Sequence, residues 1–184
     1  MRHEQIIVAA VAGVFFVWYF AGAWLNRRRG AQILGAVRQA VGAVGRGATV
    51  RWHGRSAFEV AVAEPLAPLA AFRLLCLLEP RDFPLALAWN RLRGRRDQVV
   101  IHAEFARPPR EGRPLALAEC EIPGLTGAAL SGSPPHLRLT LQVAVGGEDA
   151  IARAFALARQ LAEQPPRGQP PGGVRAASAG GAAT

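Results

Sequence analysis

The sequence predicts an α+β protein in which an N-terminal transmembrane helix precedes a domain built on an antiparallel sheet of about six strands with flanking helices. Three observations lead to this prediction: an uncharged apolar run near the N-terminus, period-two alternation in several short segments, and helical spacing of apolar residues at both ends of the region that holds those segments. They divide the chain into an anchor region (1–29), a domain (30–163) and a Pro/Gly-rich tail (164–184) that is predicted to be disordered.

The apolar run covers residues 6–25 and contains 20 residues without a charge. At about 1.5 Å per residue a helix of this length spans roughly 30 Å, the thickness of the hydrocarbon core of a bilayer. Arg27, Arg28 and Arg29 follow the run, and such charges are costly inside the bilayer. The segment is therefore predicted to be a transmembrane helix that ends at these arginines.

The charges on either side of the span predict its orientation. Arg2 and Glu4 precede the apolar run, whereas three arginines follow it. The positive-inside rule then places the N-terminus outside and the domain in the cytoplasm, as in a single-pass protein of the cytoplasmic (inner) membrane. The segment 21–23 (AGA) resembles a signal-peptidase site, but the weakly charged N-terminal flank and the arginines beyond the site favour an uncleaved signal-anchor.

The first half of the domain contains a helix, a hairpin and a further strand. Ile33, Val37 and Val41 recur at helical spacing within 30–45, which predicts a helix packed on its own domain, with a position near the membrane as the alternative. The segments that follow predict strands over 49–53 and 57–63 joined by a hairpin turn, a strand over 69–78 and a short helix over 83–93.

The second half of the domain is predicted to contain three strands and a closing helix. The strands cover 97–106, 115–122 and 136–145, and the helix covers 147–163. The last strand is the clearest, because every second residue from Leu137 to Val145 is apolar. In element order alone this arrangement resembles pleckstrin-homology-like barrels, which are the alternative architecture.

The composition excludes several kinds of site. All 22 basic residues are arginine, so the chain has no lysine for a Walker phosphate loop or a Schiff base. The net charge is +9, but the anchor region and the tail carry +5 of it, and a domain of net charge +4 does not favour nucleic-acid binding. Cys76 and Cys120 lie in apolar segments without C-x-x-C spacing, which predicts buried thiols in a reducing compartment.

Residues that could perform chemistry are scattered along the sequence. The four histidines show no metal-ligand spacing. His102 and Glu104 share one face of a predicted strand, where a solvated polar face is the simpler interpretation. Ser131 and Ser133 lie in a Pro/Gly-rich loop and lack the surroundings of a nucleophile elbow. We therefore expect no enzymatic activity, no metal and no cofactor.

The strongest candidate surface is a cluster of arginines. Arginine binds phosphates through two parallel hydrogen bonds, and the cytoplasmic leaflet is anionic. The alternative is a solvated helix end in an arginine-rich chain. The candidate contacts to phosphate or lipid are Arg27, Arg28 and Arg29 beside the span and Arg91, Arg93, Arg95 and Arg96 after the short helix.

Two functional hypotheses follow. The first is a membrane-anchored accessory or scaffold protein whose cytoplasmic domain binds a protein partner or anionic lipid headgroups. Within the span, Ala9 and Gly13 offer a small-residue face for another helix. The second is a membrane-tethered enzyme or ligand-binding domain, in which Cys120, His102, Glu104 and His136 would meet around a pocket.

Overall fold

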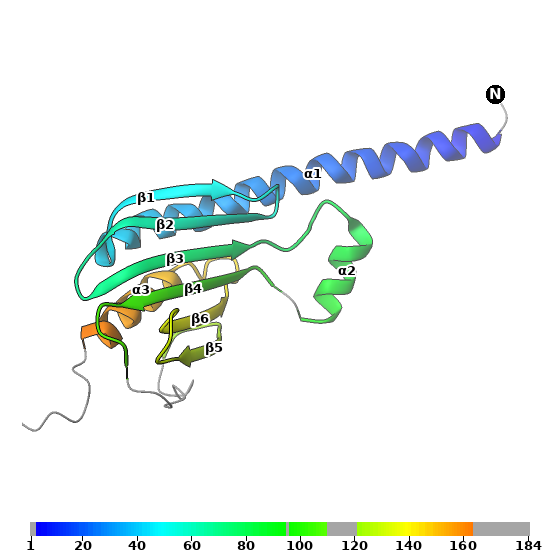
Figure 1. Cartoon of the computed structure of the whole chain (residues 1–184). Coiled ribbons are helices and arrows are strands. Elements are labelled where there is room, and N and C mark those ends of the chain that lie inside the picture. The colour runs from blue at the N-terminus through cyan, green and yellow to red at the C-terminus, as the bar shows by residue number, and fades with distance from the viewer. Residues whose placement is uncertain (1–2, 95, 110–120, 164–184) are drawn as a thin grey trace, which may run out of the picture.

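The structure, a computed structural model, describes residues 3–94, 96–109 and 121–163. A long helix leads into a sheet of antiparallel strands, a short helix projects from one end of the sheet, and a third helix closes the fold (Figure 1). The elements are α1 (His3–Ala40), the 3-10 turn η1 (Val41–Ala43), β1 (Gly45–Trp52), β2 (Ala57–Pro65), β3 (Leu69–Leu77), α2 (Pro84–Leu92), β4 (Gln98–Phe105), β5 (Leu125–Leu130), β6 (Leu137–Gln142) and α3 (Asp149–Glu163).

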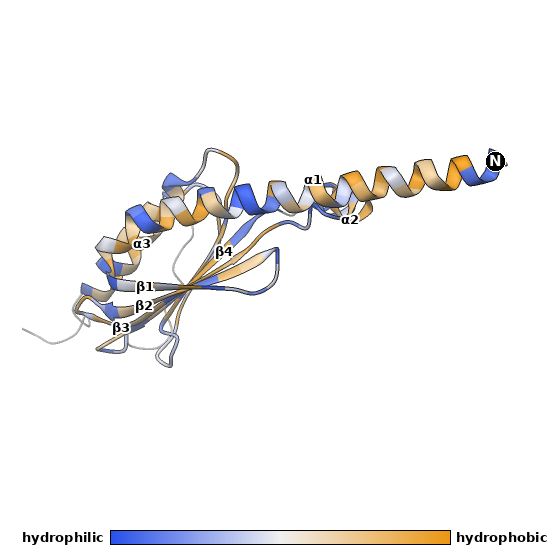
Figure 2. Cartoon of the chain, turned by 90° about the horizontal axis from the view of Figure 1, so that it is seen from above, coloured by the Kyte–Doolittle hydropathy of each residue, from blue (hydrophilic) through white to orange (hydrophobic). Residues whose placement is uncertain are grey.

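The described strands form one open sheet with the order β1-β2-β3-β4-β6-β5, and every pair of neighbours is antiparallel. The C-terminal half of α1 and the whole of α3 cover one face of this sheet (Figures 1 and 2). The α+β architecture is thus confirmed. The barrel alternative is wrong, because β1 and β5 lie at opposite edges and the helices, rather than closure of the sheet, cover its apolar face.

The core lies between the sheet and the two helices. Alternation along β4 and β6 places Val99, Ile101 and Leu139 on the covered face, as predicted, and each is fully buried. From α3, Phe155 packs edge-on against Phe72 of β3, with ring centroids 4.8 Å apart. Burial of each such large side chain contributes roughly 1.5–3 kcal/mol, so this layer supplies most of the stability of the fold.

The first helix is longer than predicted. The segment predicted to span the membrane and the helix expected at 30–45 are one continuous helix of 38 residues, and Arg27, Arg28 and Arg29 lie within it rather than at its end. Residues 3–21 of this helix are exposed, and from Gly22 to Ala40 the domain covers one side of it. The buried positions recur at intervals of about three and four residues: Gly22, Asn26, Arg29, Gly30, Ile33, Val37 and Ala40.

Most of the other predicted elements are present within a few residues, including the 57–63 and 69–78 strands and the short helix. One strand was missed, β5, whose Gly127 interrupts any apolar alternation. The strand predicted over 115–122 lies mostly outside the described residues, as does the tail at 164–184 and Cys120, and Ile122 is not in a strand.

Two side chains lie differently from expectation. Val145 was predicted to face inward, but it is 79% exposed because the chain leaves the sheet after β6. Trp52 was interpreted as a core residue, yet it is 43% exposed at the edge strand β1, where its ring packs on Phe58 and against Gly30 of α1. Cys76 is fully buried, as expected.

Candidate functional site

A buried ionic network lies where α1 enters the domain, and Arg29 is its centre. Only 5% of this arginine is exposed. Its Nε donates to Asp97 Oδ2 at 3.0 Å, and Nη2 donates to the backbone oxygens of Val143 and Ala144 at 3.1 and 2.6 Å. Its Nη1 donates to Gln32 and forms an ion pair with Glu148. All five N–H donors of the guanidinium therefore have partners, which is what burial of an arginine requires.

Asp97 joins this arginine to the loop before α2. Its carboxylate accepts from Arg81 Nη2 at 3.0 and 3.1 Å and from the backbone N–H of Glu79 at 2.9 Å. Arg81 in turn donates through Nη1 to Asn26 Oδ1 on α1 at 2.8 Å. The network therefore connects α1, the start of β4 and the loop after β3 at one point.

Glu79 is the weakest member of the network. Its side chain is buried, but Oε1 has no hydrogen-bond partner among the described residues. The nearest cations are Arg81 Nη2 at 3.8 Å and Arg91 Nε at 3.9 Å. At these distances the attraction is Coulombic rather than a hydrogen bond, and Glu79 balances the charge of the two arginines.

A large apolar surface begins beside this network. Most of α1 between residues 6 and 20 is apolar and exposed, which Figure 2 shows as the orange half of the helix. Within the described residues this is the one helix that is long and apolar enough to cross a membrane, judged by length and composition. The exposed large side chains are Ile6, Ile7, Val8, Val11, Val14, Phe15, Phe16, Val17, Trp18, Tyr19 and Phe20.

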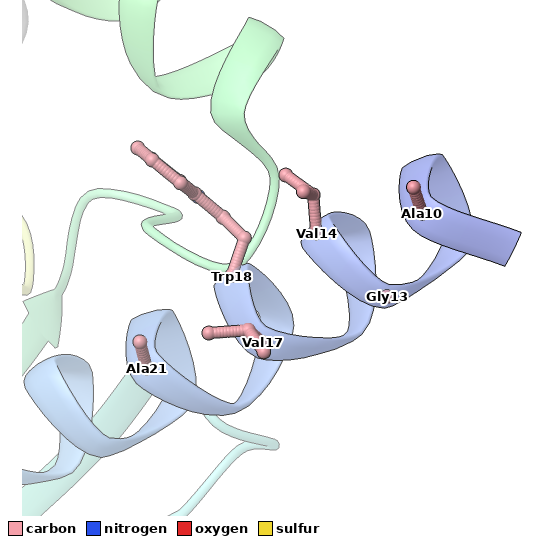
Figure 3. Close-up of a pocket in the computed structure, with 6 residues that line it drawn as sticks. All are labelled: Ala10, Gly13, Val14, Val17, Trp18 and Ala21. Atoms are coloured by element: carbon pink, nitrogen blue, oxygen red, sulfur yellow. The ribbon is translucent and has the colours of Figure 1, made fainter. Parts of the chain in front are cut away.

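The short helix α2 extends the apolar surface. It lies beside α1 near Val14 and Trp18 (Figures 1 and 3). The side chains of Leu85, Trp89 and Leu92 are 70, 56 and 83% exposed, and their spacing of four and three residues places them on one face. This apolar face of the short helix is therefore exposed.

The loop before α2 is held against α1. Trp18 Nε1 donates to the backbone oxygen of Arg81 at 3.1 Å. Four residues further along the helix, Gly22 lies so close that a Cβ there would overlap the same carbonyl group. The turn between β1 and β2 also reaches α1, because Arg55 donates to the hydroxyl of Tyr19 and lies over its ring.

A hollow on α1 faces this region. It is apolar, has a volume of about 460 Å³, and is built around Gly13, which has no neighbour within 4 Å of its missing side chain (Figure 3). The lining is small or apolar at spacings of three and four: Ala10, Gly13, Val14, Val17, Trp18 and Ala21. Such a face admits close approach of another helix or of an acyl chain.

The candidate arginines are not equivalent in the structure. Arg27 and Arg28 are exposed on α1, and Arg28 lies 5.6 Å from the Trp24 ring, whereas the guanidinium of Arg29 faces the domain and is fully engaged there. Arg91, Arg93 and Arg96 are exposed around the end of α2. Arg93 lies 4.3 Å above the ring of Trp89. Arg95 lies outside the described residues.

The described residues of the pocket hypothesis do not gather at one place, and Cys120 lies outside the described residues. His136 is buried, and its Nδ1 accepts the backbone N–H of Phe105 at 2.9 Å, whereas His102 and Glu104 lie on the uncovered face of the sheet. Burial, together with a weak influence of Asp97, raises the pKa of the Cys76 thiol to about 12, which makes it unreactive. Ser131 and Ser133 bond to each other in an exposed turn. In the described part of the chain, no three His, Cys, Asp or Glu side chains gather as a metal site would require.

Two arginines flank a histidine on the uncovered face of the sheet, and these three residues form a cationic row. His102 on β4 is directly opposite Arg73 on β3 and Arg138 on β6. Burial, and then the charges of Arg138 and Arg73, hold the pKa of His102 below 6.5. The nearest carboxylates on this face are Glu104, two residues along β4, and Glu59 on β2, which is paired with His53. Neither arginine of this row forms an ion pair within the described residues.

Comparisons with known proteins identify no relative: no protein-family model, no curated protein and no solved structure matches this chain. The functional argument therefore rests on the geometry described above. The sequence indicated the apolar helix and the arginines but not the network, whose members lie up to 119 residues apart.

Replacement of Arg29 by methionine should destabilise the domain by about 3–5 kcal/mol, because the buried carboxylate of Asp97 loses a partner. Arg28→Met is the matched control, since it removes an exposed arginine one position earlier, and it should cost less than about 1 kcal/mol. Chemical unfolding of both variants in detergent micelles measures the difference. Equal stabilities of the two variants would show that the network does not hold the fold together.

Glu148 should make stability depend on pH in the acidic range. Burial raises the pKa of its carboxyl, but the hydrogen bond and charge of Arg29 and the backbone N–H groups of Glu148 and Gly146 outweigh it and hold the pKa below 4.5. The unfolded chain therefore takes up this proton first, so the stabilisation is complete above pH 4.5 and is lost as the pH falls below it. The melting temperature of Glu148→Gln should be below that of the wild type at pH 7, and the gap should close towards pH 3. For the control Glu163→Gln, the difference in melting temperature from the wild type is not expected to shrink in this way. If the difference for Glu148→Gln stays constant between pH 7 and pH 3, Glu148 is not the group that makes stability depend on pH.

Proposed function

We propose that this chain is a single-pass membrane protein that holds its α+β domain at the membrane surface as an accessory or scaffold subunit. The observation that carries the proposal is the apolar half of α1. Its residues 6–20 remain exposed beyond the domain, although burial of so many large apolar side chains would be strongly favourable. A bilayer provides the apolar surroundings that the domain itself does not.

The arginines support an orientation with the domain in the cytoplasm. Arg27 and Arg28 are exposed on α1 just beyond the apolar half, where they would meet the headgroups of an anionic leaflet. Arg91, Arg93 and Arg96 add positive charge beside α2 on the same side of the domain. These contacts favour anionic lipids as one partner of the domain.

The hollow around Gly13 supports a scaffold role. It lies on the part of α1 that would be inside the bilayer, and its small residues permit another transmembrane helix to approach closely. A partner helix bound here would be linked through α1 to the domain. We therefore propose a membrane protein as the second partner.

The span can be tested by charge insertion. Val11→Arg/Val14→Arg places two arginines in the apolar half, each costing about 2.5–3.5 kcal/mol in a spanning helix. The wild type should stay in the membrane fraction after alkaline carbonate extraction, and so should the control Gln39→Arg, whereas the double variant should be released. Release of the wild type would contradict the proposal. For orientation, a phosphatase fused to the C-terminus should be inactive, and an active fusion would place the domain outside.

The cationic row on the open sheet face favours a second candidate function, a ligand-binding domain for anions. Arg73 and Arg138 lie on either side of His102, on the two strands that flank β4, and an oxyanion bound between them would offset the repulsion between their positive charges. His102 lies between the two arginines and would add a hydrogen-bond donor. This face is separate from α1 and α2, so the two candidate functions are compatible.

Sulfate provides a probe for this site, because its charge is constant between pH 5 and pH 8. Binding to the full-length protein in micelles should strengthen several-fold as the pH falls from 7.5 to 5.5, since His102 takes up a proton beside the anion. The double variant Arg73→Ala/Arg138→Ala should abolish sulfate binding, and His102→Ala should remove the pH dependence of sulfate binding. The control Arg51→Ala should leave both the affinity and its pH dependence unchanged. If calorimetric titration with sulfate gives the same affinity for the double variant as for the wild type, the site is excluded.

A further inference from the structure

We infer that α2 is a second membrane-binding element, an interfacial helix whose Leu85, Trp89 and Leu92 insert into the bilayer beside α1. The inference rests on the proposed function, because it requires α1 to span the membrane. The ligand of α2 is therefore the lipid bilayer and not a protein.

The first reason for this inference is the length of the exposed apolar part of α1. The domain begins to cover this helix at Gly22, so the free apolar part runs from Ile6 to Ala21. These residues span about 24 Å, whereas a hydrocarbon core is roughly 30 Å thick. The free part is therefore shorter than the core by roughly 6 Å, so the bilayer boundary is expected at the level of residues 18–21, and the parts of the domain beside these residues meet the membrane–water interface.

The contacts to α1 identify which parts these are. The loop that begins at Arg81 is joined to Trp18 by a hydrogen bond and packs against Gly22 without space for a side chain. Because α2 starts at Pro84, directly after this loop, its position along α1 is fixed. Trp18 and Tyr19 lie at the level of this loop, and such aromatic side chains prefer the membrane–water interface.

The side chains of α2 fit an interfacial helix. Phe83, just before the helix, and Leu85, Trp89 and Leu92 on its nine residues are each more than half exposed, which is costly in water. At its C-terminal end, Arg91 and Arg93 can extend to the headgroups, and Arg93 already lies over the Trp89 ring. The surface continues the apolar half of α1, so one bilayer covers both.

The arginines of the segments next to α2 have partners within the protein. Arg81 directs its guanidinium away from the apolar surface to Asp97 and Asn26. Arg55 donates to the hydroxyl of Tyr19. The other charged groups near α2 are Asp82, which is partly exposed just before the helix, and the exposed arginines around its C-terminal end. Insertion of α2 therefore places no unpaired arginine of this loop in the hydrocarbon core.

Spin-label depth measurements in nanodiscs of mixed zwitterionic and anionic lipid test the inference on the full-length protein. Single cysteines are placed at Leu85, Leu92, Val11 and Gln160 in a Cys120→Ser background, where the buried Cys76 thiol does not react because its pKa is about 12. Accessibility to oxygen and to a water-soluble nickel chelate gives the depth of each label. Val11 reports on the span, and Gln160, exposed on α3, is the aqueous control.

The inference predicts that Leu85→Cys and Leu92→Cys are protected from nickel and accessible to oxygen, with Val11→Cys deepest and Gln160→Cys in water. If Val11→Cys is deep but both α2 labels are as accessible to nickel as Gln160→Cys, α2 lies in water and the inference is wrong, while the proposed span stands. If Val11→Cys itself is in water, the proposed function and the inference fail together.

Discussion

The ionic contacts of Arg29 determine how the apolar helix is attached to the domain. A buried guanidinium is tolerated only when its charge is balanced and its five donors are satisfied, and here Asp97, Glu148, Gln32 and two backbone oxygens meet that requirement. Because these partners come from the start of β4, the segment after β6 and the residue before α3, one side chain fixes four parts of the fold. After β6 the backbone oxygens of Val143 and Ala144 accept from Arg29, while the N–H of Val143 still donates to the oxygen of Asp97 beside β4.

Because of this attachment, one half of α1 packs on the domain while the other half of the same continuous helix extends beyond it. Its C-terminal half is a core helix that buries Ile33 and Val37 against the sheet, and its N-terminal half is apolar on all sides. A helix without a break between its two halves would transmit any movement of the apolar half directly to the domain. The loop that contacts Trp18 and Gly22 extends the attachment beyond Arg29 and positions α2 beside the apolar half.

Elements with regular apolar spacing could be predicted from the sequence, and those that depend on distant partners could not. β4 and α3 were predicted because their buried residues recur every two or every three to four positions. β5 was missed because its Gly127 and its small side chains depend on pairing with β6. Arg29 was grouped with Arg27 and Arg28, although its spacing of four residues from Ile33 places it on the buried stripe; only the positions of Asp97 and Glu148 in the fold make an arginine acceptable there.

The apolar half of α1 and the α+β domain are expected to move as one rigid unit. Distance measurements by double electron–electron resonance between labels at Val8→Cys on α1 and Gln160→Cys on α3 test this directly in nanodiscs, with Cys120→Ser as the background. One narrow distance distribution is expected, and Arg29→Met should broaden it because the helix loses its attachment. A broad or multimodal distribution in the protein with Arg29 intact would show that the helix and the domain are not rigidly joined.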